Sequence, residues 1–228
     1  MKNYRPIALT SILGKLIESV ITDELVRQLE EGGIINLSQH GFRSGTGCHT
    51  ALISMWSGVT NYVESHEGCS IVGLDMTKAF DLADHQVLID EMSECKIEYK
   101  LGEVVKSWLE NKTQFVQIGD EKSNKKPING SVVQGSRLGP VLWLIYINGL
   151  LNKLQAMGQK FSAFADNVII YGLVNSRDGE RKIQESLYVI QKWSGDNYMK
   201  FSDAKSNYMN PELDTTLTSS GYQTWKSD

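Results

Sequence analysis

The chain has 228 residues, 41% of them hydrophobic and 22% charged, which is typical of a globular protein with a substantial core. It has no run of about 18 apolar residues and no signal-peptide core, so we expect no transmembrane helix and no membrane partner. The three cysteines (Cys48, Cys69 and Cys95) are widely spaced, which favours reduced thiols in an intracellular protein over disulfides or a zinc site. The net charge of −4 lacks the basic balance of nucleic-acid-binding proteins. A nucleic-acid partner would therefore need basic residues concentrated on one face or supplied by another part of a larger protein.

The N-terminal part is predicted to be helical. Apolar residues at helical spacing predict an amphipathic helix over 13–31, which Gly32 and Gly33 end. A loop rich in glycine and serine follows over 36–47, and Thr46 is expected to cap a second helix that reaches about Val63. The apolar face of the first helix is predicted to consist of Leu16, Ile17, Val20, Ile21, Leu25 and Leu29.

Helices and short strands alternate over the rest of the chain. We expect a strand over 71–75, a helix over 85–95 capped by Asp84, and a second helix over 101–110. A hairpin is predicted from 115–118, a turn over 119–126 and a return over 127–133. Pro140 opens an apolar helix over 141–154. A hairpin over 161–171, a helix over 181–197 and one or two short strands over 199–209 complete an α+β pattern.

The hairpin over 161–171, FSAFADNVIIY, carries a carboxylate at its tip. Its two apolar strands are expected to meet in a turn at Asp166-Asn167, because both side chains can bond the local backbone and tolerate the left-handed region. A carboxylate at the tip of an apolar hairpin is costly to desolvate unless something binds it. An ordinary turn aspartate is the alternative interpretation.

A second apolar strand, IVGLD, also ends at a carboxylate, Asp75. If the two strands are neighbours, roughly 4.8 Å apart, Asp75 and Asp166 converge at one edge of a sheet. Two close carboxylates repel unless a cation lies between them, and hard oxygen ligands suit Mg²⁺ completed by a phosphate. The pair therefore indicates a two-metal phosphoryl-transfer site. A structural aspartate that caps the next turn is the alternative.

Six stretches in one order extend this pattern over most of the chain. They are YRPIALTSILGKLIE, QHGFRSGTGCHTAL, LDMTKAFDLADH, VVQGSRLGPVLWLIYIN, FADN and the late KS. They resemble the motif blocks of reverse transcriptases, in wording closest to those of non-LTR (LINE-type) retrotransposons, from about Asn3 to about Met209. The resemblance implies the palm of a right-hand polymerase, an antiparallel sheet with helices on one face, with partial helical fingers and no thumb after the last strand.

The resemblance also implies a domain organisation. The reverse transcriptase domain would cover 1–209, with partial fingers over 1–66 and mainly palm over 67–209. The segment 96–133 could return to the fingers. The polar segment 210–228 is expected to be a loose tail.

The resemblance assigns roles at the metal site. Asp75 and Asp166 would bind two Mg²⁺ ions, for which Mn²⁺ could substitute. The Met76 backbone carbonyl and Asn167 would be further ligands. Lys205 lies where the family has a lysine near the triphosphate, and it could protonate the pyrophosphate leaving group.

Nucleotide contacts are implied on the same grounds. Phe80 would exclude a ribose 2′-hydroxyl, although a plain core phenylalanine explains it equally well. Gln134 and Gly135 would lie beside the incoming nucleotide and the template, with Gly135 permitting close backbone approach. Cations of the fingers would grip the triphosphate, or would be ordinary surface charges. These cations are Arg5, Lys15 and Arg43.

One departure from the family bears on function. The family has Asp-Asp in the hairpin where this chain has Asp166-Asn167, and asparagine keeps a neutral oxygen but loses a charge. The first functional hypothesis is an RNA-directed DNA polymerase that binds an RNA template, a DNA primer and deoxynucleoside triphosphates. The alternative is a truncated relic, catalytically weakened or inactive, that keeps the fold and at most binds nucleic acid. An α/β hydrolase is excluded by the lack of a G-x-S-x-G motif. Neither the oligomeric state nor the choice between nucleus and cytoplasm follows from the sequence.

Overall fold

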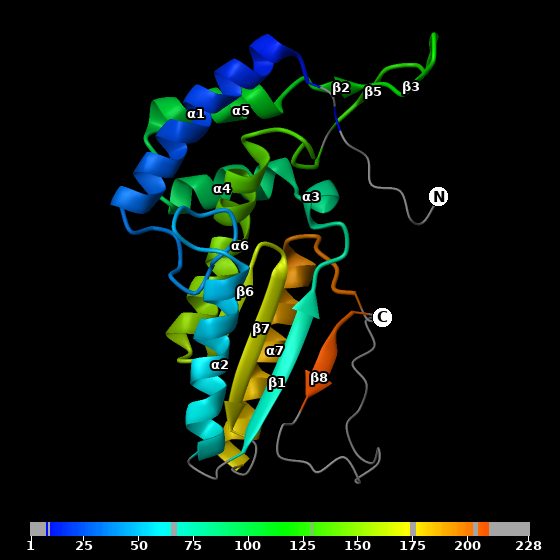
Figure 1. Ribbon diagram of the computed structural model, residues 1–228. Coiled ribbons are helices and arrows are strands. Elements are labelled where there is room, and N and C mark those ends of the chain that lie inside the picture. The colour runs from blue at the N-terminus through cyan, green and yellow to red at the C-terminus, as the bar shows by residue number, and fades with distance from the viewer. Residues whose placement is uncertain are drawn as a thin grey trace. The chain divides into compact units, whose positions relative to one another are not determined.

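A computed structural model of the protein describes residues 8, 10–64, 68–128, 130–173, 177–202 and 205–209. The chain forms two compact units (Figure 1). Unit 1 comprises Met1–Ile35 and Phe80–Ile147, and unit 2 comprises Asn36–Ala79 and Asn148–Asp228. Among the described residues, no helix is long and apolar enough to cross a membrane. The predicted polar tail over 210–228 lies outside the described residues, and the predicted division into fingers and palm stays a prediction.

Unit 2 contains a four-stranded antiparallel sheet in the order β6-β7-β1-β8 (Figure 1). The strands β6 (Lys160–Phe164) and β7 (Asn167–Leu173) form a hairpin. The strand β1 (Cys69–Asp75) comes from a distant part of the chain, yet it pairs with β7 along its whole length. The strand β8 (Asn207–Met209) forms the other edge. The predicted neighbourhood of the Asp75 strand and the hairpin is thereby confirmed.

Helices lie on both faces of this sheet, whereas the sequence led us to expect one face. The helix α2 (Cys48–Glu64) approaches β7 so closely that a Cβ on Gly58 would lie 2.5 Å from the Tyr171 ring. The helix α7 (Arg177–Asp196) meets the opposite face, where Ile183 lies against Gly172. Successive strand residues point to opposite faces, so Tyr171 and Gly172 assign the two helices to different sides.

Unit 1 is mainly helical. Its helices are α1 (Ile12–Glu31), α4 (His85–Glu94) and α5 (Tyr99–Leu109), with the short α3 (Ala79–Leu82) at its boundary. The helix α6 (Gly139–Ala156) begins in unit 1 and ends in unit 2, and every residue over 141–147 is buried. A helix that is hydrophobic all round belongs in a core, which explains this burial.

The predicted β-hairpin of unit 1 is confirmed, but its turn is shorter than expected. The strands β3 (Gln117–Ile118) and β4 (Glu121–Lys122) pair with only two residues between them, and Gly119 supplies a φ of +60°. The flanking strands β2 (Thr113–Gln114) and β5 (Lys126–Pro127) pair further down the same hairpin. The return strand therefore begins at 121 and not at 127, because Gly119 and Asp120 suffice for a tight turn.

The helix α1 begins one residue before its predicted start and ends at its predicted residue, but it buries only part of its predicted face. Ser11 caps its start by accepting from the Gly14 N–H, and Gly33, with a φ of +58°, follows its end. Ile21, Leu25 and Leu29 are buried as predicted, whereas the apolar residues of the first half are exposed. The buried side of that half is polar instead, because Glu18 accepts a hydrogen bond from the Arg137 N–H. The exposed residues that were predicted to be buried are Leu16 (60%), Ile17 (62%) and Val20 (72%).

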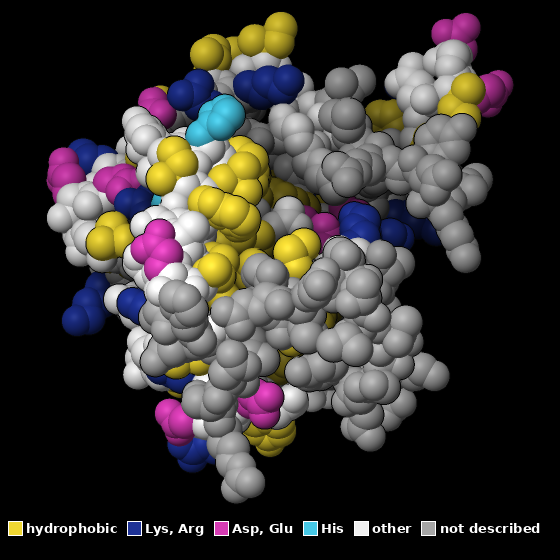
Figure 2. Space-filling view, turned by 60° about the horizontal axis from the view of Figure 1, so that its bottom comes forward, with side chains coloured by type: hydrophobic (Ala, Val, Ile, Leu, Met, Phe, Trp, Pro, Cys, Tyr) yellow, Lys and Arg dark blue, Asp and Glu magenta, His cyan; other side chains and the backbone are white. Residues whose placement is uncertain are grey.

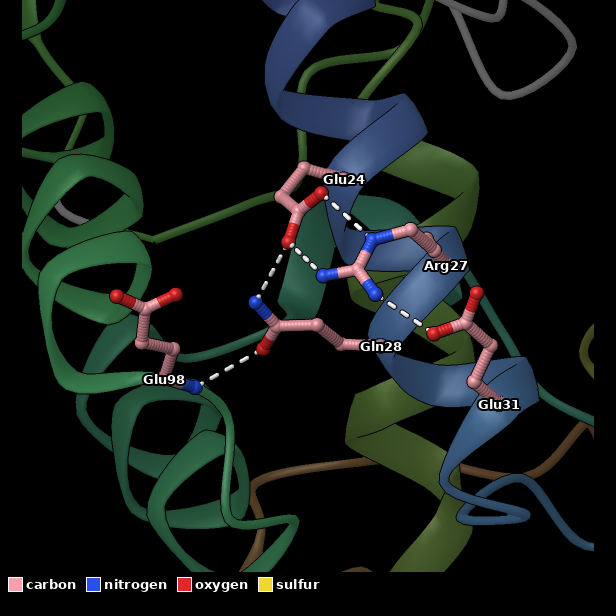
Figure 3. Close-up of polar contacts among 5 residues, drawn as sticks. All are labelled: Glu24, Arg27, Gln28, Glu31 and Glu98. Carbon is pink, nitrogen blue, oxygen red and sulfur yellow. Dashed lines mark hydrogen bonds and ion pairs between the residues drawn. The ribbon is translucent and has the colours of Figure 1, made fainter.

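Polar contacts connect α1 to the start of α5 (Figure 3). The Arg27 guanidinium pairs with Glu24 through two hydrogen bonds and with Glu31 through a third. The pairing with Arg27 lowers the pKa of the Glu24 carboxyl to about 2. Gln28 donates to Glu24 and accepts from the backbone N–H of Glu98, the N-cap residue of α5. Gln28 therefore satisfies the backbone N–H of the residue at which α5 begins.

The structure confirms one of the predicted helix caps and contradicts another. Asp84 accepts from the N–H groups of Gln86 and Val87 and caps α4, as predicted. The helix α2 begins at Cys48, so Thr46 is one residue too early to cap it. The Thr46 hydroxyl instead donates to the His40 carbonyl and stabilises the preceding loop.

The surface also carries hydrophobic side chains, which gather on the face seen in the space-filling view (Figure 2). In unit 2 the exposed hydrophobic residues of α2 include Leu52, Ile53 and Trp56. The buried side of this helix instead uses Ala51 and Val59. The helix α2 is thus apolar on two sides, and only one of these sides packs into the core of unit 2.

Candidate active site

The pairing of β1 with β7 brings Asp75 to the tip of the β6–β7 hairpin. Asp75 lies directly opposite Asn167, and Asn167 also closes the hairpin opposite Phe164. The two turn residues are Ala165 and Asp166, so the predicted turn at Asp166-Asn167 is wrong by one residue. Ala165 adopts a φ of +55°, a conformation that residue preference assigns to glycine, asparagine or aspartate. This is why the sequence placed the turn one position too late.

The register places Asp75 and Asp166 near each other. Directly opposite Cα atoms in an antiparallel pair lie about 4.5–5.5 Å apart, and consecutive Cα atoms lie about 3.8 Å apart. The Cα atoms of Asp75 and Asp166 are therefore within roughly 9 Å, because Asn167 is opposite the first and adjacent to the second. Side chains of opposite residues share one face, so the Asn167 amide lies on the same face as the Asp75 carboxylate.

Lys205 already provides Asp75 with a cation. The Lys205 Nζ lies 3.1 Å from Asp75 Oδ1, and the Asp75 side chain is only 18% exposed. The backbone around Asp75 is fixed as well, because the Ser202 N–H donates to the Asp75 carbonyl. Two residues that are 130 apart in sequence are thus paired by the return of the chain after α7.

The Met76 backbone forms a bridge with Phe201 in which its own polar groups take no part. The hydrogen bonds of this bridge are donated by the N–H groups of Thr77 and Ser202, to the carbonyls of Lys200 and Asp75. Carbonyls on an extended chain alternate in direction, so the Met76 carbonyl points to the side on which β7 lies. A carbonyl in this direction is compatible with the predicted role of Met76 as a backbone ligand.

A residue that the sequence did not single out, Gln39, contacts the turn itself. Gln39 is fully buried, its Nε2 donates to the Ala165 carbonyl (3.2 Å), and its Oε1 accepts from the Ala165 N–H (3.0 Å). The same Oε1 accepts from the N–H of Gly41. The residue stands in the QHGFR stretch, so the motif signalled the position, but its contact with Ala165 depends on a pairing 126 residues away in sequence.

Arg43 and His40 belong to the loop that carries Gln39. Arg43 Nη1 donates to the carbonyls of Asn36 and Gln39, so the guanidinium that was predicted to bind nucleotide is engaged within the loop. His40 is buried with Nδ1 2.9 Å from the Thr50 hydroxyl, and burial, aided by the Arg43 charge, lowers the pKa of its imidazole. The nucleotide-binding role of Arg43 stays a prediction.

The other predicted nucleotide contacts lie in unit 1. The Phe80 ring stacks on the buried Trp143 ring with centroids 5.6 Å apart. Gln134 Nε2 donates to the Asp81 carboxylate, and Gly135 is exposed with a φ of +96°. Lys15 is exposed on α1. Arg5 lies outside the described residues.

The chemistry of the donors at the hairpin tip fits a divalent metal ion. Asp75, Asp166 and Asn167 offer only oxygen donors or a neutral amide, which is the hard ligand type that Mg²⁺ prefers. The Asp75 carboxylate is paired with the ammonium of Lys205, so this position accepts positive charge. Among the residues that the structure describes, no group of three or more His, Cys, Asp and Glu side chains could hold a metal. Substrate or water oxygens would therefore complete the coordination.

Comparison with known sequences connects this geometry to one family. A sequence profile described as reverse transcriptase (RNA-dependent DNA polymerase) matches residues 1–223. The chain is 28% identical over 198 residues to the "Probable RNA-directed DNA polymerase from transposon BS" of Drosophila melanogaster, which covers 84% of this chain and 22% of that protein. It is also 28% identical over 200 residues to the RNA-directed DNA polymerase of the mobile element jockey, with the same coverage of both chains. The chain thus spans about a fifth of the length of these relatives.

Comparison with solved structures supports the fold. A telomerase of Candida tropicalis, in complex with a fragment of telomeric RNA, superposes with a TM-score of 0.68 at 12% identity, over 85% of this chain and 34% of that chain. At this identity the likeness concerns the fold alone. It agrees with a polymerase palm with partial fingers.

Proposed function

Because the chain belongs to the reverse transcriptase (RNA-dependent DNA polymerase) family, we propose that it carries the polymerase site of a non-LTR retrotransposon enzyme. This site would add deoxynucleotides to a primer 3′-hydroxyl on an RNA template. The observation that carries the proposal is the β1–β7 register, which brings Asp75 to the turn that holds Asp166. Two carboxylates, one at the end of β1 and one in the turn of the neighbouring hairpin, match the requirement of two-metal phosphoryl transfer.

The metal-binding residues would be Asp75 and Asp166, with the Met76 carbonyl and the Asn167 amide oxygen as weaker ligands. Mg²⁺ bound there would activate the primer hydroxyl and neutralise charge on the triphosphate. Lys205 holds the Asp75 carboxylate in the described structure and would move to the triphosphate when substrate arrives. From there its ammonium would donate a proton to the pyrophosphate leaving group.

Residues of unit 1 would select and orient the substrates. Phe80 is supported by its stacking on Trp143, which would give it the rigidity that rejection of a ribose 2′-hydroxyl needs. Gln134 would position the template and the incoming base, and its hydrogen bond to Asp81 supports a fixed orientation. Arg5 and Lys15 would contribute positive charge to the triphosphate, and the same role is proposed for Arg43 in the loop of unit 2.

A second candidate function is nucleic-acid binding without efficient polymerisation, and Asn167 favours it. A carboxylate about 4 Å from a unit positive charge contributes roughly 4 kcal/mol at an effective dielectric of 20, and more beside a divalent ion. Asn167 lacks this charge directly opposite Asp75. We therefore expect weaker metal binding than in a site with three carboxylates.

Primer extension by the full chain on an RNA template tests the proposed function. We expect weak extension with Mg²⁺ and stronger extension with Mn²⁺, which binds such ligand sets somewhat more tightly. The variant Asp75→Asn should abolish both. Extension by Asp75→Asn at the rate of the unaltered chain would refute the assignment of the site.

A further inference from the structure

We propose that Gln39 is a positioning residue, which holds the Ala165-Asp166 turn in the shape that metal binding requires. The inference rests on the proposed function of the Asp75–Asp166 site. The loop that precedes α2 in unit 2 would thereby contribute to catalysis, although none of the atoms of this loop would touch the metal or the substrate.

The contact is specific because Gln39 recognises both polar groups of one turn residue. Its amide nitrogen donates to the Ala165 carbonyl and its amide oxygen accepts from the Ala165 N–H. Gln39 is fully buried, so neither hydrogen bond competes with bulk water. If the side chain were removed, buried backbone groups of Ala165 would lose these two hydrogen bonds.

The turn needs such support because its backbone is strained. Ala165 has a φ of +55°, and a residue with a Cβ enters this region only when the surrounding structure imposes it. Gly41 allows the loop to come close enough to impose it. A Cβ on Gly41 would lie 2.3 Å from the Ala165 nitrogen and 2.9 Å from its Cα, distances that no side chain can occupy.

The loop that carries Gln39 is itself anchored. The His40 N–H donates to the Ala163 carbonyl and the Ala163 N–H donates to the Ser38 carbonyl, which joins the loop to the edge of β6 next to the turn. The Asn36 N–H donates to the side chain of Asn148 on α6, and the Asn36 side chain donates to two further α6 residues. Gln39 is therefore a fixed reference point for the turn.

Asp166 follows Ala165 directly, so the conformation of Ala165 sets the direction of the Asp166 side chain. A metal ligand must be placed to within a fraction of an ångström, and residues that orient ligands typically change metal affinity by about 10–100-fold. The loss of Gln39 is therefore expected to weaken metal binding far more than its effect on stability would suggest.

A matched pair of variants of the full chain tests this inference. Gln39→Met replaces the clamp with an apolar side chain of similar size. Gln159→Met makes the same change at a second buried glutamine, which donates to the carbonyls of Lys160 and Tyr171 at the opposite end of the same hairpin. Both variants lose buried hydrogen bonds, so both should lower the melting temperature by a similar amount.

Two readouts separate positioning from stability. The first is the dissociation constant of Mn²⁺ alone, measured by electron paramagnetic resonance. The second is the hydrogen-exchange rate of the Ala165 N–H. In Gln39→Met we expect Mn²⁺ to bind about tenfold more weakly and the Ala165 N–H to exchange faster, whereas Gln159→Met should leave both unchanged.

The outcomes also distinguish a failure of the inference from a failure of the proposed function. If Gln39→Met leaves Mn²⁺ affinity and Ala165 exchange at the values of the unaltered chain, Gln39 is not a positioning residue. The same conclusion follows if Gln159→Met weakens Mn²⁺ binding equally. If Asp166→Asn leaves the Mn²⁺ affinity of the unaltered chain unchanged, the metal site itself is wrong, and the exchange rate alone still reports whether Gln39 holds the turn.

Two glycines of the same loop supply an independent comparison. Gly41→Ala would force the loop away from Ala165 and should reproduce both effects of Gln39→Met. Gly47→Ala adds a methyl group in open space, at a position without a positive φ, and should change neither. Equal Mn²⁺ affinity of the two alanine variants would contradict the inference.

Discussion

At the level of single residues, the described partners of Asp75 are one charged side chain and one neutral side chain. The carboxylate faces a neutral amide across the strand pair and has the Lys205 ammonium as its ion-pair partner. Lys205 is 60% exposed, so the pair gains little from a low dielectric. We therefore expect the ion pair to matter for the reaction and not for the stability of the fold.

Replacing Lys205 with methionine separates these two contributions. Lys205→Met should change the free energy of unfolding by less than about 1 kcal/mol, because partly exposed ion pairs contribute little. It should reduce the Mn²⁺-dependent extension rate by at least about 100-fold, the low end of general acid catalysis. Denaturant unfolding and single-turnover extension measure the two effects. A variant that extends primers normally would show that Lys205 has no role beyond its contact with Asp75.

His40 makes stability depend on pH in a predictable direction. In the folded protein, burial lowers the pKa of the His40 imidazole below its ordinary value of 6.5, so the unfolded chain binds a proton more readily. Stability is therefore complete above about pH 6.5 and decreases as the pH falls towards the lower folded-state value. His40→Gln should remove this dependence between pH 7.5 and 5.5, and exposed His49→Gln should retain it. Melting curves at the two pH values measure this dependence. Identical pH dependence in both variants would contradict the predicted role of His40.

At the scale of the element, helices and strands were predictable where local chemistry is decisive. Asp84, Gly32 and Pro140 marked helix ends that the structure bears out. The errors arose where a distant contact overrides preference. Ala165 takes a left-handed conformation in contact with Gln39, and the first half of α1 buries Glu18 in place of its apolar residues. No local pattern contains either contact.

The link between α1 and α5 gives a testable case of such a contact. Gln28→Met removes the acceptor for the Glu98 N–H at the start of α5 and should destabilise the fold by about 0.5–1.5 kcal/mol, independently of salt. Arg27→Met breaks only exposed ion pairs, and its small effect should shrink further in 1 M salt. Urea unfolding at low and high salt measures both. A salt-sensitive Gln28 variant would indicate that the charges, and not the cap, connect the helices.

At the scale of the whole molecule, the sequence identified the two aspartates but not what positions them. Apolar strands that end in Asp75 and Asp166 predicted their convergence, and the register confirms that the strands are neighbours. The organisation into two units was not predictable in this form, because Asn36–Ala79 joins the sheet of unit 2 and not the helices before it. Gln39 lies in that segment, so its contact with Ala165 could not be predicted without knowing that the segment packs with the sheet.

We propose that the end of β1 and the hairpin tip form a metal site in which Asn167 replaces a charged ligand. Melting curves of the unaltered chain and of Asn167→Asp, each with and without Mg²⁺, are the decisive measurement. Without metal, Asn167→Asp should melt slightly lower, because it adds a like charge beside Asp75 and Asp166. With Mg²⁺ at about 100 times its dissociation constant, an ion that binds only the folded state stabilises it by about 2.7 kcal/mol, so Asn167→Asp should gain more than the unaltered chain. Identical responses of the two proteins to Mg²⁺ would show that Asn167 does not lie in a metal site.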